Sequence, residues 1–194
     1  MTRITLLPRD MGSRFSSMKR KGMLGAAALA CGVAVCAAAD NDTVTTRLIG
    51  YQETPQTINS AASGEFKATI HGDGTAIDYE LTYRDLSSSP TQAHIHFGRP
   101  GLSGGVVLFL CTNLTPPAGV PTPQACPAPP ATLTGTLTAA NVIPLPTQGI
   151  DAGAAGFAEM LKAIRANAAY ANVHTPLHPG GEIRGRLSQE RDDH

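Results

Sequence analysis

Three histidines have the side-chain type and spacing needed to share one metal ion. His94 and His96 lie two positions apart in the β-favouring run 92–97, so both side chains project from one face of a strand, about 7 Å apart at the backbone. His174 ends a second strand-like run and supplies a third imidazole if the two strands are neighbours. Neutral imidazole nitrogens are ligands for copper and zinc. The sequence therefore predicts a copper or zinc site at His94, His96 and His174.

The same histidines also have a purely structural interpretation. Buried imidazoles can satisfy backbone groups by hydrogen bonding, and strand histidines without carboxylate or thiolate partners commonly do so. In that case His94 and His96 tie their strand to the turn that follows His174. Both interpretations stay open at the level of the sequence, and they differ in whether the ring nitrogens bind an ion or a protein group.

A His-x-His pair on a strand resembles the copper motif of the copper–zinc superoxide dismutases, which have a Greek-key sandwich. The likeness is partial, because those enzymes also need a fourth copper ligand, a bridging imidazole and an Asp-containing zinc cluster. The spare histidines of the predicted domain, His71 and His178, have no matching spacing. The sequence therefore does not favour superoxide dismutase activity.

Motifs of other reaction classes are missing from the sequence. It contains no Ser-His-Asp arrangement, nucleophile elbow or carboxylate pair at a convincing spacing. The glycines of 97–105 (FGRPGLSGG) suit a turn better than a phosphate cradle, because no helix pattern follows them. Glu182 and Arg184 alternate on one strand face, where we expect Arg184 to form a structural ion pair. We predict no catalytic residues and favour a non-enzymatic binding or interaction module over an enzyme.

Short β-favouring runs separated by Gly, Pro, Asn and Ser clusters dominate the chain from Thr43 onward, as is typical of a sandwich or barrel. The clearest hairpin joins 63–71 to 75–85 through Gly72-Asp73-Gly74, because Asp-Gly supplies the positive φ angles of a tight turn. Further strands are predicted at 43–51, 92–97, 105–110, 132–138, 169–174 and 182–187.

One helix is predicted, directly before the penultimate strand. Asp151 is placed to cap it, and apolar residues between 157 and 164 recur at helical spacing. Asn167 suits the left-handed position that ends many helices. We expect this short helix to pack on the end of the β domain.

The first 39 residues have the features of an export signal. A basic stretch, Arg14 to Lys21, precedes an apolar run rich in Ala and Gly. The run ends in Ala37-Ala38-Ala39, the small-residue pattern that a signal peptidase accepts, so we predict cleavage before Asp40.

An uncleaved membrane anchor and a lipoprotein acylated at Cys31 or Cys36 are the alternatives to cleavage. Both are less favoured, because the run is weakly hydrophobic and neither cysteine has a convincing leucine three positions upstream. We therefore expect a secreted or periplasmic protein without a stable membrane anchor. Its predicted organisation is a cleaved signal peptide over 1–39, a β domain over 40–188 and a short tail over 189–194.

The predicted mature chain keeps two cysteines, Cys111 and Cys126. An exported compartment is oxidising, and neither cysteine lies in a CxxC or redox motif, so a disulfide is favoured over a metal thiolate pair or two free thiols. The segment from Thr115 to Pro130 holds seven prolines, which cannot donate ladder hydrogen bonds. We predict a surface loop there, held at its ends by the disulfide.

Charge excludes one class of partner. From Asp40 on, nine basic residues stand against fourteen acidic ones, a net charge of −5 with His neutral, and the chain has no Trp. A mildly acidic domain without a basic run lacks the electrostatic footprint of a nucleic-acid-binding protein. We therefore expect no nucleic acid as a partner.

Two stretches of the sequence resemble signatures of the chordin-type (CHRD) domain family: 93–110 (AHIHFGRPGLSGGVVLFL) and 170–187 (YANVHTPLHPGGEIRGRL). The opening strand, 48–55 (LIGYQETP), is also similar, and the order of all three matches. The resemblance covers about Thr45 to Leu187. It implies a mainly β fold, an immunoglobulin-like or Greek-key antiparallel β-sandwich, while the family's molecular function is poorly defined.

These observations predict an exported CHRD-type binding module. The alternative is a metal-binding protein that uses copper or zinc. The sequence does not specify the partner, whether a protein or a small ligand.

Overall fold

The computed structural model describes residues 42–188 of the chain. The predicted signal peptide, 1–39, and the tail, 189–194, lie outside the described residues. Regular structure consists mainly of eight strands with one α-helix, α1 (Gly153–Arg165), and the 3-10 helix η1 (Gly50–Gln52) follows the first strand. The strands are β1 (Asp42–Ile49), β2 (Ser63–Ile70), β3 (Ala76–Arg84), β4 (Gln92–Phe97), β5 (Gly105–Thr112), β6 (Ala131–Thr138), β7 (Ala169–His174) and β8 (Ile183–Leu187).

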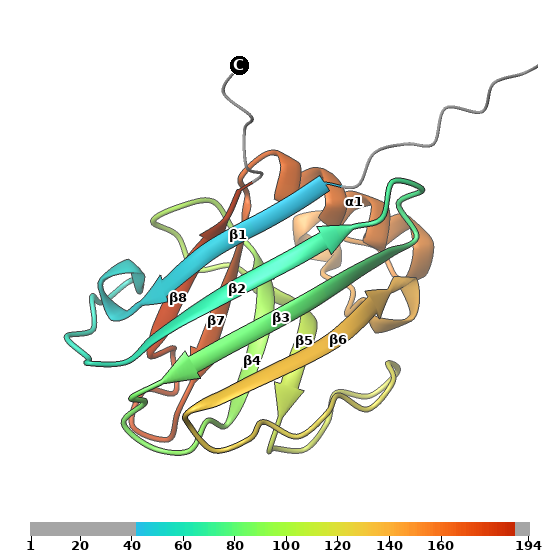
Figure 1. The fold of residues 1–194 in the computed structure, drawn as a ribbon. Helices are drawn as coiled ribbons and strands as arrows, with labels where there is room; N and C mark the ends of the chain where they lie inside the picture. The colour runs from blue at the N-terminus through green and yellow to red at the C-terminus, as the bar shows by residue number, and fades with distance from the viewer. Residues whose placement is uncertain (1–41, 189–194) are drawn as a thin grey trace, which may run out of the picture. The chain divides into compact units, whose positions relative to one another are not determined.

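The eight strands form one antiparallel sheet in the order β5-β4-β7-β8-β1-β2-β3-β6. In Figure 1 the strands β1, β2, β3 and β6 make the front layer, and β8, β7, β4 and β5 lie behind them. The layers meet where β1 and β8 share a single residue pair, Ile49 with Arg184. The sheet therefore wraps around its core like a barrel.

The predicted mainly β class and the helix before the penultimate strand are confirmed, but the sandwich is not. A sandwich consists of two separate sheets packed face to face. Here β1 pairs with β2 from Asp42 to Ile49 and also reaches β8 at its end, so hydrogen bonds connect the two layers. The fold is barrel-like for that reason.

Alternate residues of the strands build the core between the two layers. Phe66 and Ile70 of β2 and Leu81 and Tyr83 of β3 are buried, on the faces that the period of two predicted. The hairpin between β2 and β3 is also confirmed, with Ile70 paired to Ile77 next to the turn.

Helix α1 packs its predicted apolar face inward. Phe157, Met160 and Ile164 are buried in the same hydrophobic cluster as the strands. Asn167 has the predicted left-handed conformation, with φ 57°. Within residues 42–188, no helix is long and apolar enough to cross a membrane.

The predicted cap of α1 is wrong. Ala152, not Asp151, holds the N-cap position, and no side chain caps the helix there. The chain instead turns back so tightly that a Cβ on Gly156 would lie 1.8 Å from the Asp151 carbonyl oxygen. The Asp151 backbone N–H donates to the Glu159 carboxylate at 2.9 Å. A glycine at 156 is thus required by the close approach.

The two edge strands, β5 and β6, are not paired with each other. The predicted disulfide joins them indirectly, because Cys111 on β5 bonds Cys126 in the Pro-rich loop before β6, with 5.0 Å between the Cα atoms. The Tyr79 hydroxyl of β3 adds a hydrogen bond to the Leu110 carbonyl of β5, 2.8 Å long. Covalent and side-chain contacts therefore hold the barrel together on this side.

Candidate metal centre

Strands β4 and β7 carry the three predicted ligands on one face of the sheet. The strands pair antiparallel, and His94 lies opposite Asn172, two residues before His174. Residues two apart on a strand share a face, so His174 faces the same side as His94 and His96. The sequence prediction depended on these strands being neighbours, and they are.

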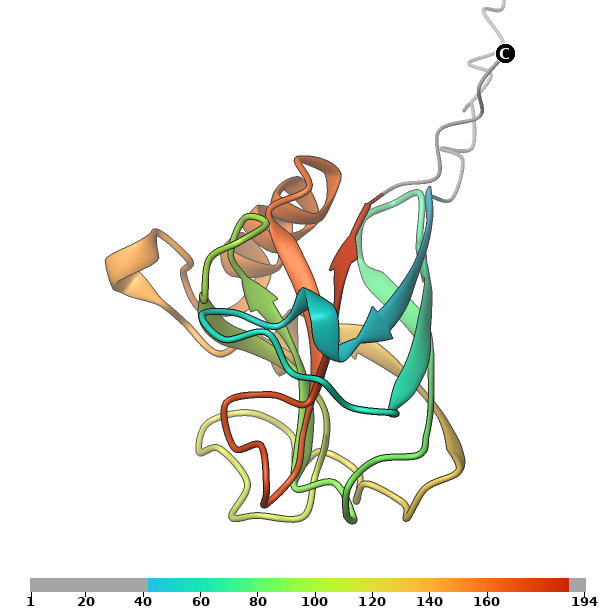
Figure 2. The same cartoon turned by 90° about the vertical axis from the view of Figure 1, so that its left-hand side faces the viewer.

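This face points away from the hydrophobic core yet is covered. Ile95, between the two histidines of β4, belongs to the core, so His94 and His96 point to the opposite side. Even so, His94, His96 and His174 are only 1%, 7% and 5% exposed. Figure 2 shows three connections on that side of the sheet, and they are the β1–β2, β4–β5 and β7–β8 connections.

Hydrogen bonds to two of these connections orient two of the rings. Nδ1 of His96 lies 3.0 Å from the Gly104 carbonyl oxygen, and Nδ1 of His174 lies 3.0 Å from that of Pro179. A carbonyl oxygen only accepts hydrogen bonds, so Nδ1 carries the proton in each neutral ring. Nε2 of His96 and of His174 therefore keeps a free lone pair, which is the form that binds a metal.

The nitrogens not used in these bonds lack partners. Nε2 of His96, Nε2 of His174 and both ring nitrogens of His94 are buried without a hydrogen bond in the described structure. Leaving a buried polar atom unpaired costs about 1–3 kcal/mol each. Four unpaired nitrogens are thus concentrated at one place in the fold.

The histidine cluster, His94 with His96 and His174, has dimensions that suit one ion. One nitrogen from each ring can be chosen so that all three lie within 4.8 Å of one another. Bonds of about 2.0–2.1 Å to an imidazole bring ligand nitrogens to roughly 3.3–3.5 Å apart. Small ring movements would therefore complete the coordination, and the ion would give a partner to three of the four unpaired atoms.

Burial keeps these imidazoles neutral. Desolvation, with the neighbouring His174 and His96, lowers the pKa of His94 to about 2. Desolvation also lowers the pKa of His96 to about 4, against the hydrogen bond to Gly104, and it lowers the pKa of His174. At neutral pH the cluster thus offers uncharged nitrogen ligands.

Aromatic rings wall the cluster. The Tyr170 ring of β7 stacks on His96, with centroids 4.6 Å apart and an interplanar angle of 6°. The Phe109 ring lies nearly perpendicular to the His94 ring, at an interplanar angle of 76° and a centroid distance of 4.4 Å. The Arg184 guanidinium of β8 lies 3.4 Å from the centre of the Tyr170 ring, a close cation–π contact. Aromatic rings therefore cover one side each of His94 and His96, with a fixed cation one ring away from His96.

Arg184 does not form the expected ion pair. Its guanidinium donates to the Thr54 hydroxyl and, at 2.8 Å, to the Leu102 carbonyl. No carboxylate within residues 42–188 lies within salt-bridge distance of Arg184. The tyrosine ring and two neutral oxygens take the place of the predicted acid.

Two buried carboxyl groups lie beside the cluster and have opposite protonation behaviour. Burial raises the pKa of Glu53 to about 7, although the Asn172 amide donates to it at 2.6 Å and Arg184 is nearby. Burial also acts to raise the pKa of Glu182, but hydrogen bonds that include those from Ser87 and Thr175 outweigh it, and the pKa is lowered. Glu182 is thus a charged anchor for the loops, whereas Glu53 titrates near neutrality.

Comparison of the sequence with models of known protein families gives a match that extends over all eight strands. The CHRD domain matches residues 44–187, from β1 to the end of β8. The chain belongs to the CHRD domain family. The resemblance seen in the sequence is thereby confirmed. No curated protein and no solved structure matches the chain.

Sequence reasoning missed several neighbours of the histidines in this CHRD domain. Tyr170 and Asn172 precede His174 by four and two positions, so the period of a strand places them on its face. That signal was available in the motif YANVH. Glu53 is different, because it follows η1 in an irregular connection, where no periodicity indicates which way a side chain points.

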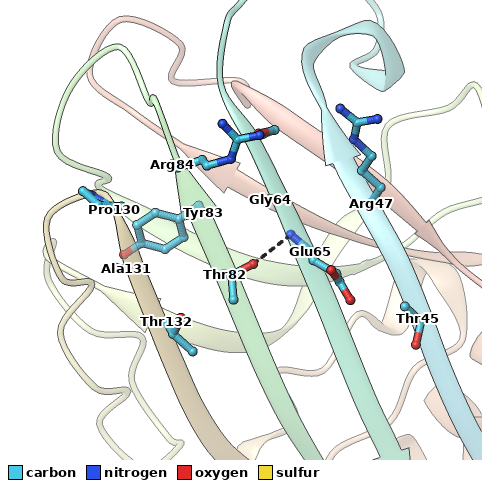
Figure 3. A pocket seen from close by; sticks show the side chains of 11 residues that line it. Thr45, Arg47, Gly64, Glu65, Thr82, Tyr83, Arg84, Pro130, Ala131 and Thr132 are labelled. Atoms are coloured by element: carbon cyan, nitrogen blue, oxygen red, sulfur yellow. Dashed lines mark hydrogen bonds between the residues drawn. The ribbon is translucent and has the colours of Figure 1, made fainter.

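A surface hollow of the CHRD domain lies on other strands than those that carry the histidine cluster. It has a volume of about 600 Å³ and runs over β1, β2, β3 and the start of β6. Figure 3 shows its polar lining, with Thr45 and Arg47 on β1, Arg84 on β3, and Thr82 bonded to the backbone of Glu65 on β2, the strand between them. Partly exposed side chains of this kind are solvated, so the hollow lacks the unsatisfied buried atoms that single out the histidine cluster.

Proposed function

We propose that this protein is an exported CHRD-domain binding module, and that it binds a transition-metal ion, copper or zinc, through His94, His96 and His174. One observation carries the proposal: the Nε2 atoms of His96 and His174 and the nitrogens of His94 lie together, buried and without hydrogen-bond partners. Imidazole nitrogens suit both metals.

The structural interpretation of the histidines accounts for only part of the arrangement. It explains the Nδ1 bonds of His96 and His174 to backbone carbonyls. It leaves the remaining four nitrogens unpaired, and a metal ion would give three of them a partner. The balance of these contacts favours metal binding.

The protein's own groups would perform three tasks at such a centre. The carbonyls of Gly104 and Pro179 hold the rings of His96 and His174 in orientation, as outer partners of metal-bound histidines commonly do. Burial keeps the rings unprotonated. The covering connections exclude water, and a bound metal supplies Lewis acidity or electron-transfer capacity to a partner.

Export is part of the proposal and has separate support. The disulfide between Cys111 and Cys126 is of the kind that persists in oxidising compartments. The basic and apolar residues before Asp40 have the order of a secretory signal.

Calorimetric titration of tag-free, chelator-treated protein with copper and zinc tests the metal site. We expect one ion per chain, and a loss of affinity greater than about 100-fold in each of His94→Ala, His96→Ala and His174→Ala, because a ligand bond contributes more than its outer partners. His71→Ala is the matched control. His71 lies at the end of the β2–β3 hairpin, bonded to Asp78, and should leave the affinity unchanged.

Parent protein that binds neither metal above background would refute the proposal, whatever the variants do. Equal losses in the control and in the three variants would also contradict it, since they would locate the binding elsewhere.

A further inference from the structure

We infer that the histidine cluster selects monovalent copper, Cu(I), over the divalent ions zinc and copper(II). This inference rests on the proposed function and concerns the identity and charge of the ion. It follows from the number of ligands, their charge and the surroundings of the cluster.

The number of ligands is the first argument. Within the described residues the cluster contains three imidazoles and no further His, Cys, Asp or Glu. Zinc is almost always four-coordinate, completed by a fourth protein ligand or by a water in an open position. The cluster is at most 7% exposed at any of its histidines, which leaves little access for water. A three-coordinate geometry is stable for Cu(I), because its single charge needs less compensation from a fourth donor than the double charge of zinc.

Charge is the second argument. Three neutral imidazoles cannot offset the charge of an ion, and the cost of burying an ion rises with the square of its charge. The charged group stacked nearest to the cluster is a cation, Arg184, which contacts the Tyr170 ring that lies on His96. The two buried acids beside the cluster are engaged elsewhere and are not members of it: Glu53 accepts a hydrogen bond from Asn172, and Glu182 accepts hydrogen bonds from Ser87. The environment therefore disfavours a dication much more than a monocation.

The apolar walls are the third argument. Copper(II) prefers square-planar or tetragonal coordination by nitrogen and oxygen. The Phe109 ring packs nearly perpendicular to the His94 ring, with 4.4 Å between the centroids, and Tyr170 stacks on His96, so these sides of the cluster carry rings instead of donor atoms. On these two sides the cluster offers no extra ligand to stabilise the oxidised ion.

Paired competition titrations test this inference on the tag-free protein. Under anaerobic conditions, bicinchoninate competes for Cu(I), and a chromophoric chelator competes for zinc in a parallel series. We expect one Cu(I) per chain, bound at least ~1,000-fold more tightly than zinc, a difference of about 4 kcal/mol. X-ray absorption at the copper edge should show three nitrogen ligands. His96→Ala should abolish tight Cu(I) binding, and His71→Ala should not.

The outcomes separate the preference for Cu(I) from the presence of a metal site at the histidine cluster. Zinc affinity equal to or above that of Cu(I), or an absorption spectrum with four or more ligands, overturns the preference for Cu(I) and leaves the metal site intact. Binding of neither ion refutes both statements. Tight Cu(I) binding that survives His96→Ala places the ion outside the cluster and also refutes both.

Discussion

Acidification from pH 7 to pH 5 should destabilise the metal-free domain by an amount set by its buried titratable groups. Burial, with neighbouring histidines, lowers the pKa of His94 from 6.5 to about 2, and burial lowers that of His96 to about 4. Below pH 6.5 these histidines bind protons in the unfolded chain but stay neutral in the folded domain. Their contribution to the free energy of unfolding is therefore fully present above pH 6.5 and is lost as the pH falls. Each of these two histidines removes about 2 kcal/mol of unfolding free energy over this range.

Glu53 acts in the opposite direction. Burial raises its pKa from 4.5 to about 7, so the folded state holds a proton that the unfolded state has released. The contribution of Glu53 to the free energy of unfolding is fully present below pH 4.5 and is lost as the pH rises through 7. Acidification from pH 7 to pH 5 therefore restores about 2 kcal/mol of this free energy at Glu53. His174, whose pKa is also lowered, adds to the loss. The net destabilisation of the parent is therefore about 2 kcal/mol or more.

Urea denaturation at pH 5, 6 and 7 in the presence of a chelator measures this effect. Far-UV circular dichroism is the appropriate signal, because the chain has no Trp. Glu53→Gln keeps an acceptor for the Asn172 amide and removes the opposing titration of Glu53. From pH 7 to pH 5 this variant should therefore lose about 4 kcal/mol or more of its free energy of unfolding. His94→Phe should lose about 2 kcal/mol less than the parent over the same range.

A stability that is flat or rises from pH 7 to pH 5 in Glu53→Gln would refute the reasoning. It would mean that the histidines are not held neutral by burial in the folded state. Carboxyl groups with lowered pKa values, such as Glu182, whose ordinary value is 4.5, do not confuse the result, because they lose their contribution below this window.

Two further predictions concern the chain outside the cluster. Replacing both cysteines, Cys111→Ser with Cys126→Ser, should lower the free energy of unfolding by about 3 kcal/mol without abolishing the fold, because the bridge closes a short peripheral loop. Thermal melts of the oxidised parent and the variant measure it, and coincident melts would show that the bridge contributes nothing. The intact mass of the exported protein should correspond to a chain that begins at Asp40, and recovery of exported protein that retains Met1 would contradict the predicted cleavage.

Local sequence patterns were sufficient for most elements of the fold. The period of two in β2 and β3 is a property of the extended chain, so Phe66 and Leu81 could be placed in the core before any partner strand was known. The disulfide followed in the same way from the number of cysteines and the expected compartment. The helix cap failed because the close packing of Gly156 on the Asp151 carbonyl displaced the usual side-chain cap.

Residue types and strand spacing in the chain were enough to select His94, His96 and His174 as one set. Whether the three side chains meet depends on a strand pairing that is distant in the sequence. The strands β4 and β7 are neighbours in the sheet although about 70 residues separate them along the chain, so no local pattern could establish that they pair. The pairing of Ile49 with Arg184, also distant in the sequence, continues the sheet through β1 as a barrel. The fold also places Tyr170 on the His96 ring and the Asn172 amide against Glu53. Hydrogen-bond partners, burial and pKa values are properties of that three-dimensional neighbourhood, which is why the free lone pairs of the histidines became visible only in the folded domain.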